Sequence, residues 1–95
     1  RAPMVGHLGD GNFHVVLPYD PAKKEMYKKI REFNDLLIKK GLELNGTITG
    51  EHGVGLHKKE YLLEEHPDNI PVMKSIKRTI DPNNIMNPGK IFDLN

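Results

Sequence analysis

Apolar residues occur at alternate positions from Asn12 to Leu17, at Phe13, Val15 and Leu17, which predicts a strand that Pro18 ends. Successive side chains of a strand point to opposite sides, so His14 is expected on the face opposite Phe13. A second strand is predicted over Leu42–Thr49, where apolar residues again occur at alternate positions at its start.

A helical period separates the two predicted strands. Apolar residues recur three or four positions apart, at Met26, Ile30, Phe33 and Leu37. Asp20-Pro21 is a start signal, because aspartate caps helix N-termini and proline suits the first helical position. Gly41 suits a left-handed cap at the other end, so an amphipathic helix is expected between these signals.

Two more helices are predicted in the second half of the chain. One is short, from about His57 to Glu65, and the other runs from Asp68 to Ile80, where Asp81-Pro82 stops it. The longer helix is expected to turn three apolar residues inward, namely Met73, Ile76 and Ile80. The last dozen residues are expected to form an extended tail.

The predicted order is therefore strand, helix, strand, helix and tail. This order is typical of an α+β layer in which helices cover one face of a sheet. Two strands are too few for an independent sheet, so we expect the remaining strands upstream of Arg1 or on a partner chain. The sequence is interpreted as a fragment of a larger protein.

Composition narrows the classes of function. With 95 residues, the chain is one domain or a piece of one. Its 14 Lys+Arg and 13 Asp+Glu give a formal charge of +1, so no nucleic-acid partner is expected. The absence of cysteine excludes disulfides, thiolate nucleophiles and iron–sulfur clusters, and it directs any metal to nitrogen and oxygen ligands. A cytoplasmic location is expected.

Glycine and histidine are concentrated in two stretches, where seven of the nine glycines lie. His7 and His14 belong to the first stretch, and Glu51 and His52 to the second. Glycine bends can bring two imidazoles to one point, and two histidines with a glutamate are a common ligand set for a divalent metal. A further histidine beside such a metal suits a proton acceptor.

Plainer interpretations stay open on spacing alone. A histidine in a strand is often a hydrogen-bonded structural residue, and glycines often serve only turns. The order Glu51-His52 is not the H-E-x-x-H pattern of metalloproteases, and neither glycine stretch has the third glycine of a dinucleotide-binding fingerprint. His57 and His66 are interpreted as surface residues.

Three segments together resemble a known family. They are GHLGDGNFH at residues 6–14, GEHGVG at 50–55 and DPNNIMNPGKIF at 81–92. In order and spacing they resemble the C-terminal end of FAD-dependent 2-hydroxy-acid dehydrogenases of the vanillyl-alcohol oxidase superfamily. This family includes the glycolate oxidase large subunit, D-lactate dehydrogenase and D-2-hydroxyglutarate dehydrogenase.

The resemblance implies roles for particular residues. His7, His14 and Glu51 match positions that bind a divalent metal, expected to be Zn or Mn. His52 matches the general base, while Asn87 and Lys90 match tail positions that approach the flavin or the substrate. Some members carry an asparagine two residues beyond the second metal-binding histidine. Here that position is Val16, which argues against a 2-hydroxyglutarate-type pocket.

The resemblance also implies a fold and a reaction. Residues 1–95 would be the C-terminal part of the cap domain, a ferredoxin-like α+β fragment, with the FAD-binding domain outside this chain. A metal-assisted deprotonation of the hydroxyl of a small 2-hydroxy acid would accompany hydride transfer to FAD, and the isolated fragment would be inactive. Expected partners of the intact enzyme are the upstream FAD-binding domain, an electron-acceptor protein or quinone, and further copies of itself. A peripheral membrane position is also expected for it.

Two other interpretations remain. The chain could be a stand-alone metal-binding or interaction module without catalysis, or a structural fragment with glycine turns and no site. The sequence upstream of Arg1 separates the first from the enzyme, and metal analysis of His7→Ala and Glu51→Ala variants tests the second.

Overall fold

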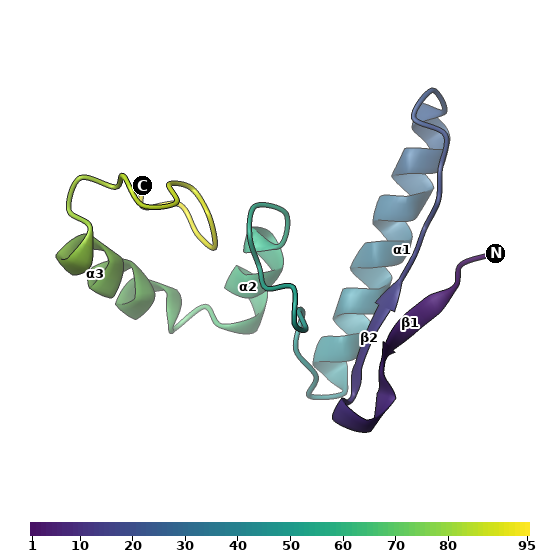
Figure 1. Ribbon diagram of the computed structural model, residues 1–95, viewed down its shortest axis with the longest axis horizontal. Helices are drawn as coiled ribbons and strands as arrows, with labels where there is room; N and C mark the ends of the chain where they lie inside the picture. Colours follow the sequence, from purple (N-terminus) through teal and green to yellow (C-terminus); the bar gives the residue numbers. More distant parts are fainter. The chain divides into compact units, whose positions relative to one another are not determined.

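An antiparallel hairpin opens the chain in the computed structural model, which describes residues 1–95 (Figure 1). Strand β1, Met4–His7, pairs with β2, Asn12–Val15, and the 3-10 turn η1, Leu8–Asp10, joins them. Gly11 closes η1 in the left-handed region, with φ 70°. The strand predicted over Asn12–Leu17 is confirmed over Asn12–Val15, whereas β1 was not predicted.

Gly6 permits the close approach of the two strands. It pairs with Phe13, and a Cβ at Gly6 would lie 2.2 Å from the Asn12 carbonyl oxygen and 2.5 Å from Phe13 Cα. Real Cβ atoms essentially never come so close. Glycine is therefore required here by lack of space.

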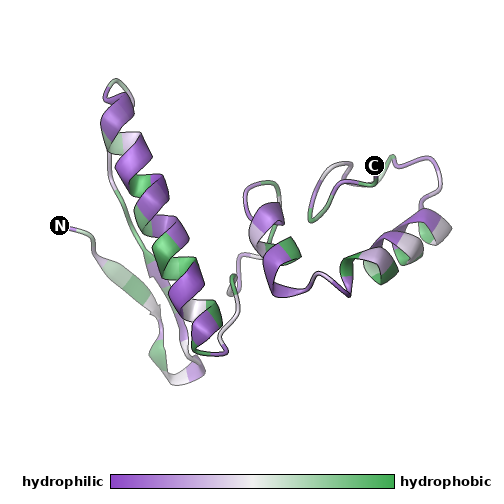
Figure 2. Ribbon diagram, turned by 180° about the vertical axis from the view of Figure 1, so that it is seen from behind, coloured by the Kyte–Doolittle hydropathy of each residue, from purple (hydrophilic) through white to green (hydrophobic).

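Helix α1, Lys24–Glu43, follows an extended segment and runs back in the opposite direction (Figure 1). The predicted start lies a few residues too early, because Asp20 forms its own turn instead of capping the helix. Its Oδ1 accepts a hydrogen bond from the Ala22 amide at 3.0 Å. Figure 2 shows the apolar residues of α1 as a broken stripe among polar ones.

The end of α1 corrects two predictions. Gly41 lies inside the helix, and residues 42–49 form its last turn and a loop instead of a strand. Asn45 takes the left-handed conformation, with φ 60°, and Gly46 N donates to Gly41 O at 2.8 Å. This is the Schellman arrangement, in which asparagine can replace glycine at the left-handed position. The alternating leucines of this segment belong to a helix end.

Two shorter helices lie in the second half of the chain, close to where they are predicted. They are α2, Lys59–Glu65, and α3, Ile70–Ile80. Both belong to the second of two compact units into which the chain divides, residues 1–46 and 47–95.

The buried apolar residues all lie in the second unit: Ile48, Leu62 and Ile70. The prediction that Ile76 and Ile80 turn inward is wrong within this chain, since both side chains are exposed, whereas Met73 is half-buried. The first residue of α3, and not its later turns, contributes to the core.

The tail after α3 is organised around the buried carboxylate of Asp81. Its Oδ1 accepts from the Ile85 amide at 3.0 Å, its Oδ2 from the Met86 amide at 2.9 Å, and Lys77 donates to it from one turn earlier in α3. The hydrogen bond from Lys77 lowers the pKa of the Asp81 carboxyl, the two amides lower it further, and burial opposes them. The predicted helix stop is thus also the anchor of the tail.

The architecture is α+β, as predicted, with one two-stranded sheet and three α-helices. The ferredoxin-like detail is not confirmed, because the expected second strand is the end of α1. No helix of the structure combines the length and the apolar character needed to cross a membrane.

Candidate functional site

The hairpin places its two histidines on one face. His7 pairs with Asn12, and His14 pairs with Val5. Directly opposed residues of an antiparallel pair share a face, as do residues two apart in one strand. His7 and His14 are therefore diagonal neighbours on the same side of the hairpin.

Glu51 and His52 occupy the two central positions of a tight turn. Gly53 N donates to Gly50 O at 3.3 Å, which closes the turn around them. Gly53 lies in the left-handed region with φ 74°, a conformation that a residue with a Cβ rarely adopts. The glycines on either side thus explain why this dipeptide stands at the tip of a loop.

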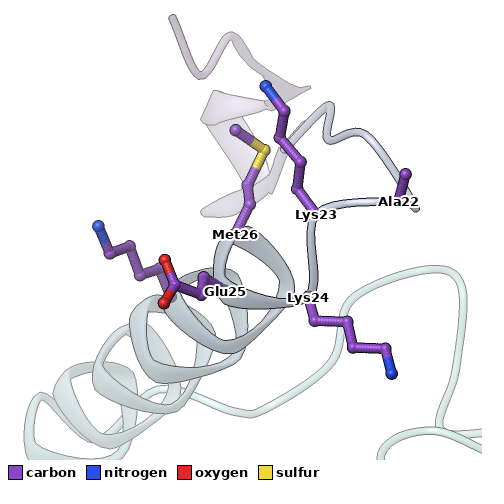
Figure 3. Close-up of a pocket in the computed structure, with 6 residues that line it drawn as sticks. Ala22, Lys23, Lys24, Glu25 and Met26 are labelled. Carbon is purple, nitrogen blue, oxygen red and sulfur yellow. The ribbon is translucent and has the colours of Figure 1, made fainter.

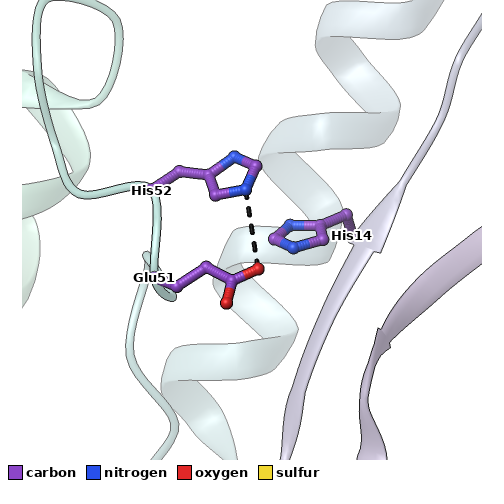
Figure 4. Close-up of side chains that lie close together, drawn as sticks. All are labelled: His14, Glu51 and His52. Atoms are coloured by element: carbon purple, nitrogen blue, oxygen red, sulfur yellow. Dashed lines mark ion pairs between the residues drawn. The ribbon is translucent and has the colours of Figure 1, made fainter.

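The two side chains of the turn form an ion pair when the imidazole is protonated. His52 Nε2 lies 3.6 Å from Glu51 Oε1, and a dashed line marks this pair in Figure 4. The side chains are 69% and 47% exposed, respectively, so both are accessible to a small molecule. A carboxylate beside an imidazole can stabilise the imidazolium that forms when histidine accepts a proton.

A threonine and a lysine hold the ends of this turn together. Thr49 Oγ1 donates to Gly53 O at 2.7 Å, and Lys58 Nζ donates to Thr49 Oγ1 at 3.3 Å. Thr49 and Lys58 are half-buried. The turn is therefore tied to the residue that immediately precedes α2.

A glutamate fixes the chain just before the turn. Glu65 Oε2 accepts from Thr47 Oγ1 at 3.1 Å and from Ile48 N at 3.2 Å, and its side chain is only 11% exposed. The buried Ile48 side chain is held at the same point. Core packing and a nearly buried carboxylate together define where the loop that carries Glu51 and His52 begins.

The predicted tail residues contact each other. Lys90 Nζ donates to Asn87 Oδ1 at 3.2 Å, and both residues are exposed. The next amide, Ile91 N, donates to Gly55 O at 2.8 Å. The tail segment is therefore hydrogen-bonded to the same loop that carries Glu51 and His52.

A hollow of about 530 Å³ lies elsewhere, at the start of α1 (Figure 3). Its lining consists of Ala22, Lys23, Lys24, Glu25, Met26 and Lys29. None of the predicted site residues lines it. Its exposed lysines agree with the interpretation of this stretch as a solvated surface.

The predicted site residues thus form three local groups. His7 and His14 share the hairpin face, Glu51 and His52 share the turn, and Asn87 and Lys90 share the tail. The sequence analysis missed the supporting residues, which are Thr49, Lys58, Glu65 and Asp81. A hydroxyl next to the first glycine of the turn was an available signal for Thr49, and the Asp-Pro helix stop was one for Asp81. Lys58 and Glu65 bond to residues nine or more positions away, which leaves no local signal.

One protein family and several known proteins are similar to this chain over nearly its whole length. The family model for FAD linked oxidases, C-terminal domain, matches residues 1–91. The chain is 45% identical over 93 residues to the probable mitochondrial D-lactate dehydrogenase of Danio rerio. The aligned residues cover 97% of this chain and 19% of that protein.

Two further relatives are a second D-lactate dehydrogenase and a glycolate oxidase subunit. The chain is 48% identical over 90 residues to the mitochondrial D-lactate dehydrogenase [cytochrome] 1 of Saccharomyces cerevisiae, covering 94% of this chain and 15% of that protein. It is 43% identical over 88 residues to glycolate oxidase subunit GlcD of Bacillus subtilis, and the aligned residues cover 92% of this chain and 19% of that protein. The chain therefore spans less than a fifth of the length of these three relatives.

Proposed function

This chain belongs to the FAD-linked oxidase family, within its C-terminal domain, and from that premise we propose that it is the substrate-side segment of a flavin-dependent 2-hydroxy-acid dehydrogenase. The observation that carries the proposal is the exposed Glu51–His52 pair at the tip of a glycine-bounded turn. The substrate class follows from the relatives, which are named for D-lactate and glycolate.

His52 is the proposed general base. A ring nitrogen of His52 takes the proton of the substrate hydroxyl, and the adjacent Glu51 carboxylate stabilises the resulting imidazolium. The chemistry that FAD supplies when bound is acceptance of the hydride from the carbon that bears the hydroxyl, which leaves a 2-oxo acid. Asn87 and Lys90 are proposed to approach the flavin or the substrate, since one amide and one ammonium group suit anionic oxygens.

His7, His14 and Glu51 are proposed ligands of one divalent cation, Zn²⁺ or Mn²⁺. The donor set fits such ions, because imidazole nitrogen suits zinc, carboxylate oxygen suits manganese, and both histidines lie on one hairpin face. The chemistry that the ion supplies when bound is orientation of the substrate and a lowered pKa of its hydroxyl. A carboxylate has two oxygens, so Glu51 can bind a cation and remain beside His52.

The partners of the whole protein are part of the same proposal. They are an upstream FAD-binding domain, a small 2-hydroxy acid and an electron-acceptor protein or quinone. Self-association, a cytoplasmic location and a peripheral membrane position stay predictions, and two of the relatives above are named as mitochondrial proteins.

Substitution of His52 tests the proposed base. In the full-length flavoprotein, His52→Ala should lower kcat for D-lactate or glycolate about 10²- to 10⁴-fold, the usual range for loss of a general base. His66→Ala is a matched control, because His66 Nε2 lies 3.5 Å from Glu65 Oε1 in a similar pair outside the turn. Wild-type kcat in the His52 variant would refute the assignment.

Metal analysis tests the proposed ligands. Purified wild-type flavoprotein should contain about one divalent ion per chain, and His7→Ala, His14→Ala and Glu51→Ala should each lose most of it, because each removes one donor. His57→Ala serves as a control histidine. Equal metal content in wild type and all three variants would remove the ligand proposal.

The isolated chain should be inactive. The purified 95 residues, supplied with FAD and D-lactate or glycolate, should show no turnover, because the FAD-binding domain is proposed to lie outside them. Turnover by this chain alone would contradict the proposal. Metal binding in a full-length protein that never holds a flavin would favour the non-catalytic module instead.

A further inference from the structure

One backbone hydrogen bond closes the turn that presents His52. It runs from Gly53 N to Gly50 O at 3.3 Å. Both closing residues are glycines, which have the greatest conformational freedom of any residue. A backbone turn of this kind does not by itself fix two exposed side chains.

A side-chain clamp adds a second restraint on the backbone of the turn. The clamp consists of the Thr49 Oγ1–Gly53 O bond of 2.7 Å and the Lys58 Nζ–Thr49 Oγ1 bond of 3.3 Å. The threonine hydroxyl spans the turn from the residue before it to its last residue. Because the hydroxyl donates to Gly53 O, its lone pairs accept from Lys58, and the two bonds orient the same group.

The clamp also connects the turn to the core of its unit. The carbonyl of Lys58 accepts the amide of Leu62 at 3.0 Å, and Leu62 is buried. Lys58 thus belongs to the first hydrogen-bonded turn leading into α2 while its ammonium reaches back to Thr49. Movement of the Glu51–His52 turn would therefore have to break the clamp or shift α2.

From this geometry we propose that Thr49 and Lys58 are positioning residues for His52, an inference that rests on the proposed function of that histidine. Their proposed role is exerted through the backbone of the turn and not through contact with the substrate or the flavin. They hold the turn so that the imidazole meets the substrate hydroxyl in one place. A small misplacement of a base by loss of such support can cost up to about 10²-fold in rate.

The test is a set of variants of the full-length flavoprotein, measured with D-lactate and with glycolate. Thr49→Val removes the hydroxyl and keeps the shape, and we expect kcat to fall about tenfold with a smaller change in KM. Thr49→Ser keeps the hydroxyl and should restore kcat to within about twofold of wild type. Thr79→Val is the matched control, because Thr79 Oγ1 donates to Ser75 O at 2.9 Å within α3, outside the clamp, and it should be neutral.

A double-variant cycle separates positioning from general structure. In a His52→Ala background, Thr49→Val should cause no further loss, because there is no imidazole left to position. An equal fold-loss in both backgrounds, or wild-type kcat in Thr49→Val, would overturn the proposal. If Thr49→Val does not fold, Lys58→Met takes its place in the cycle, with a loss expected only when His52 is present. Wild-type kcat in His52→Ala itself would overturn the proposed base as well, so the two failures are distinguishable.

Discussion

The two units of the chain differ in what holds them together. In residues 47–95, the side chains of Ile48, Leu62 and Ile70 are buried, and a buried carboxylate anchors the tail. In residues 1–46 no residue is buried, and apolar side chains such as Leu36 remain largely exposed. The first unit has only half-buried apolar side chains, such as Ile30 and Leu37, beside the backbone hydrogen bonds of its hairpin and helix, whereas the second has a buried core.

This difference bears on the proposed chemistry. His52 stands on a turn that side-chain hydrogen bonds connect to a packed helix, so its position depends on the core of the second unit. His7 and His14 stand on a two-stranded hairpin, an element that is only marginally stable by itself. We therefore expect changes in the two units to affect local stability very differently.

The largest effect is expected in the core of the second unit. Ile70 is 5% exposed, and Ile70→Ala should destabilise that unit by about 2–5 kcal/mol, because it removes buried methyl groups and leaves a cavity. Leu36→Ala, at a side chain that is 67% exposed, should change stability by less than about 0.5 kcal/mol. Native-state amide hydrogen exchange of the 95-residue chain measures both. Similar losses for the two variants would remove the distinction between the units.

A glycine substitution tests the hairpin of the first unit. Gly6→Ala should destabilise the hairpin by about 1–3 kcal/mol, because the new methyl group collides with the backbone of the opposite strand. Gly9→Ala is the control, since a Cβ there would meet nothing within 4 Å. Amide exchange across residues 4–15 reports the change. Unchanged exchange in Gly6→Ala would show that the strands are not paired in this register.

Protonation of Asp81 in acid should destabilise the tail. The hairpin should not respond to this protonation, because Asp81 lies in the other unit. The pKa of Asp81 is lowered from its ordinary value of 3.8, so its stabilising effect is present above that pH and is lost as the pH falls through the lowered folded value. Amide exchange at Ile85 and Met86 should therefore accelerate, relative to its intrinsic rate, below about pH 4. Asp81→Ala removes both side-chain acceptors and should make these amides fast at all pH values, whereas exchange in Asp68→Ala should follow wild type. Protection at Ile85 and Met86 that persists in Asp81→Ala would contradict the anchor.

The smallest effect is expected at the surface ion pair that ties the tail to α2. Lys59 Nζ lies 2.9 Å from Asp93 Oδ1, and the Asp93 side chain is 63% exposed. Asp93→Asn should cost less than about 1 kcal/mol, and less still at high salt, because exposed pairs are weak and screened. Thermal unfolding at low and high salt checks this. A loss as large as that of Ile70→Ala would mean that the tail, and not the core, stabilises the second unit.

Sequence patterns predicted the later helices well and the chain around Gly46 poorly. Helices α2 and α3 follow from helical spacing and from a proline after the last turn. The strand expected over residues 42–49 is wrong because Leu42 and Leu44 suit either period, and Asn45 takes the left-handed conformation that ends a helix. Strand β1 is four residues long with a glycine inside, which leaves little periodic signal.

Some residues of the candidate site could likewise be predicted from the sequence, and others could not. Glu51 and His52 could be found in the sequence because glycines flank them and mark a loop. The hydroxyl of Thr49 beside the first glycine was a signal, but the sequence does not name its partner, the Gly53 carbonyl. Lys58 could not be found, because it bonds to a hydroxyl nine residues away. Such bonds depend on how the loop closes against α2, which no local pattern records.

The most direct test of the account is anaerobic flavin reduction in a single turnover. Wild-type full-length flavoprotein and His52→Ala, matched for FAD content, are mixed rapidly with D-lactate or glycolate, and the loss of oxidised flavin is followed. The account predicts rapid reduction in wild type and reduction slowed by about 10²-fold or more in the variant, because proton removal from the hydroxyl then lacks its base. Equal rates of flavin reduction in the two proteins would contradict it.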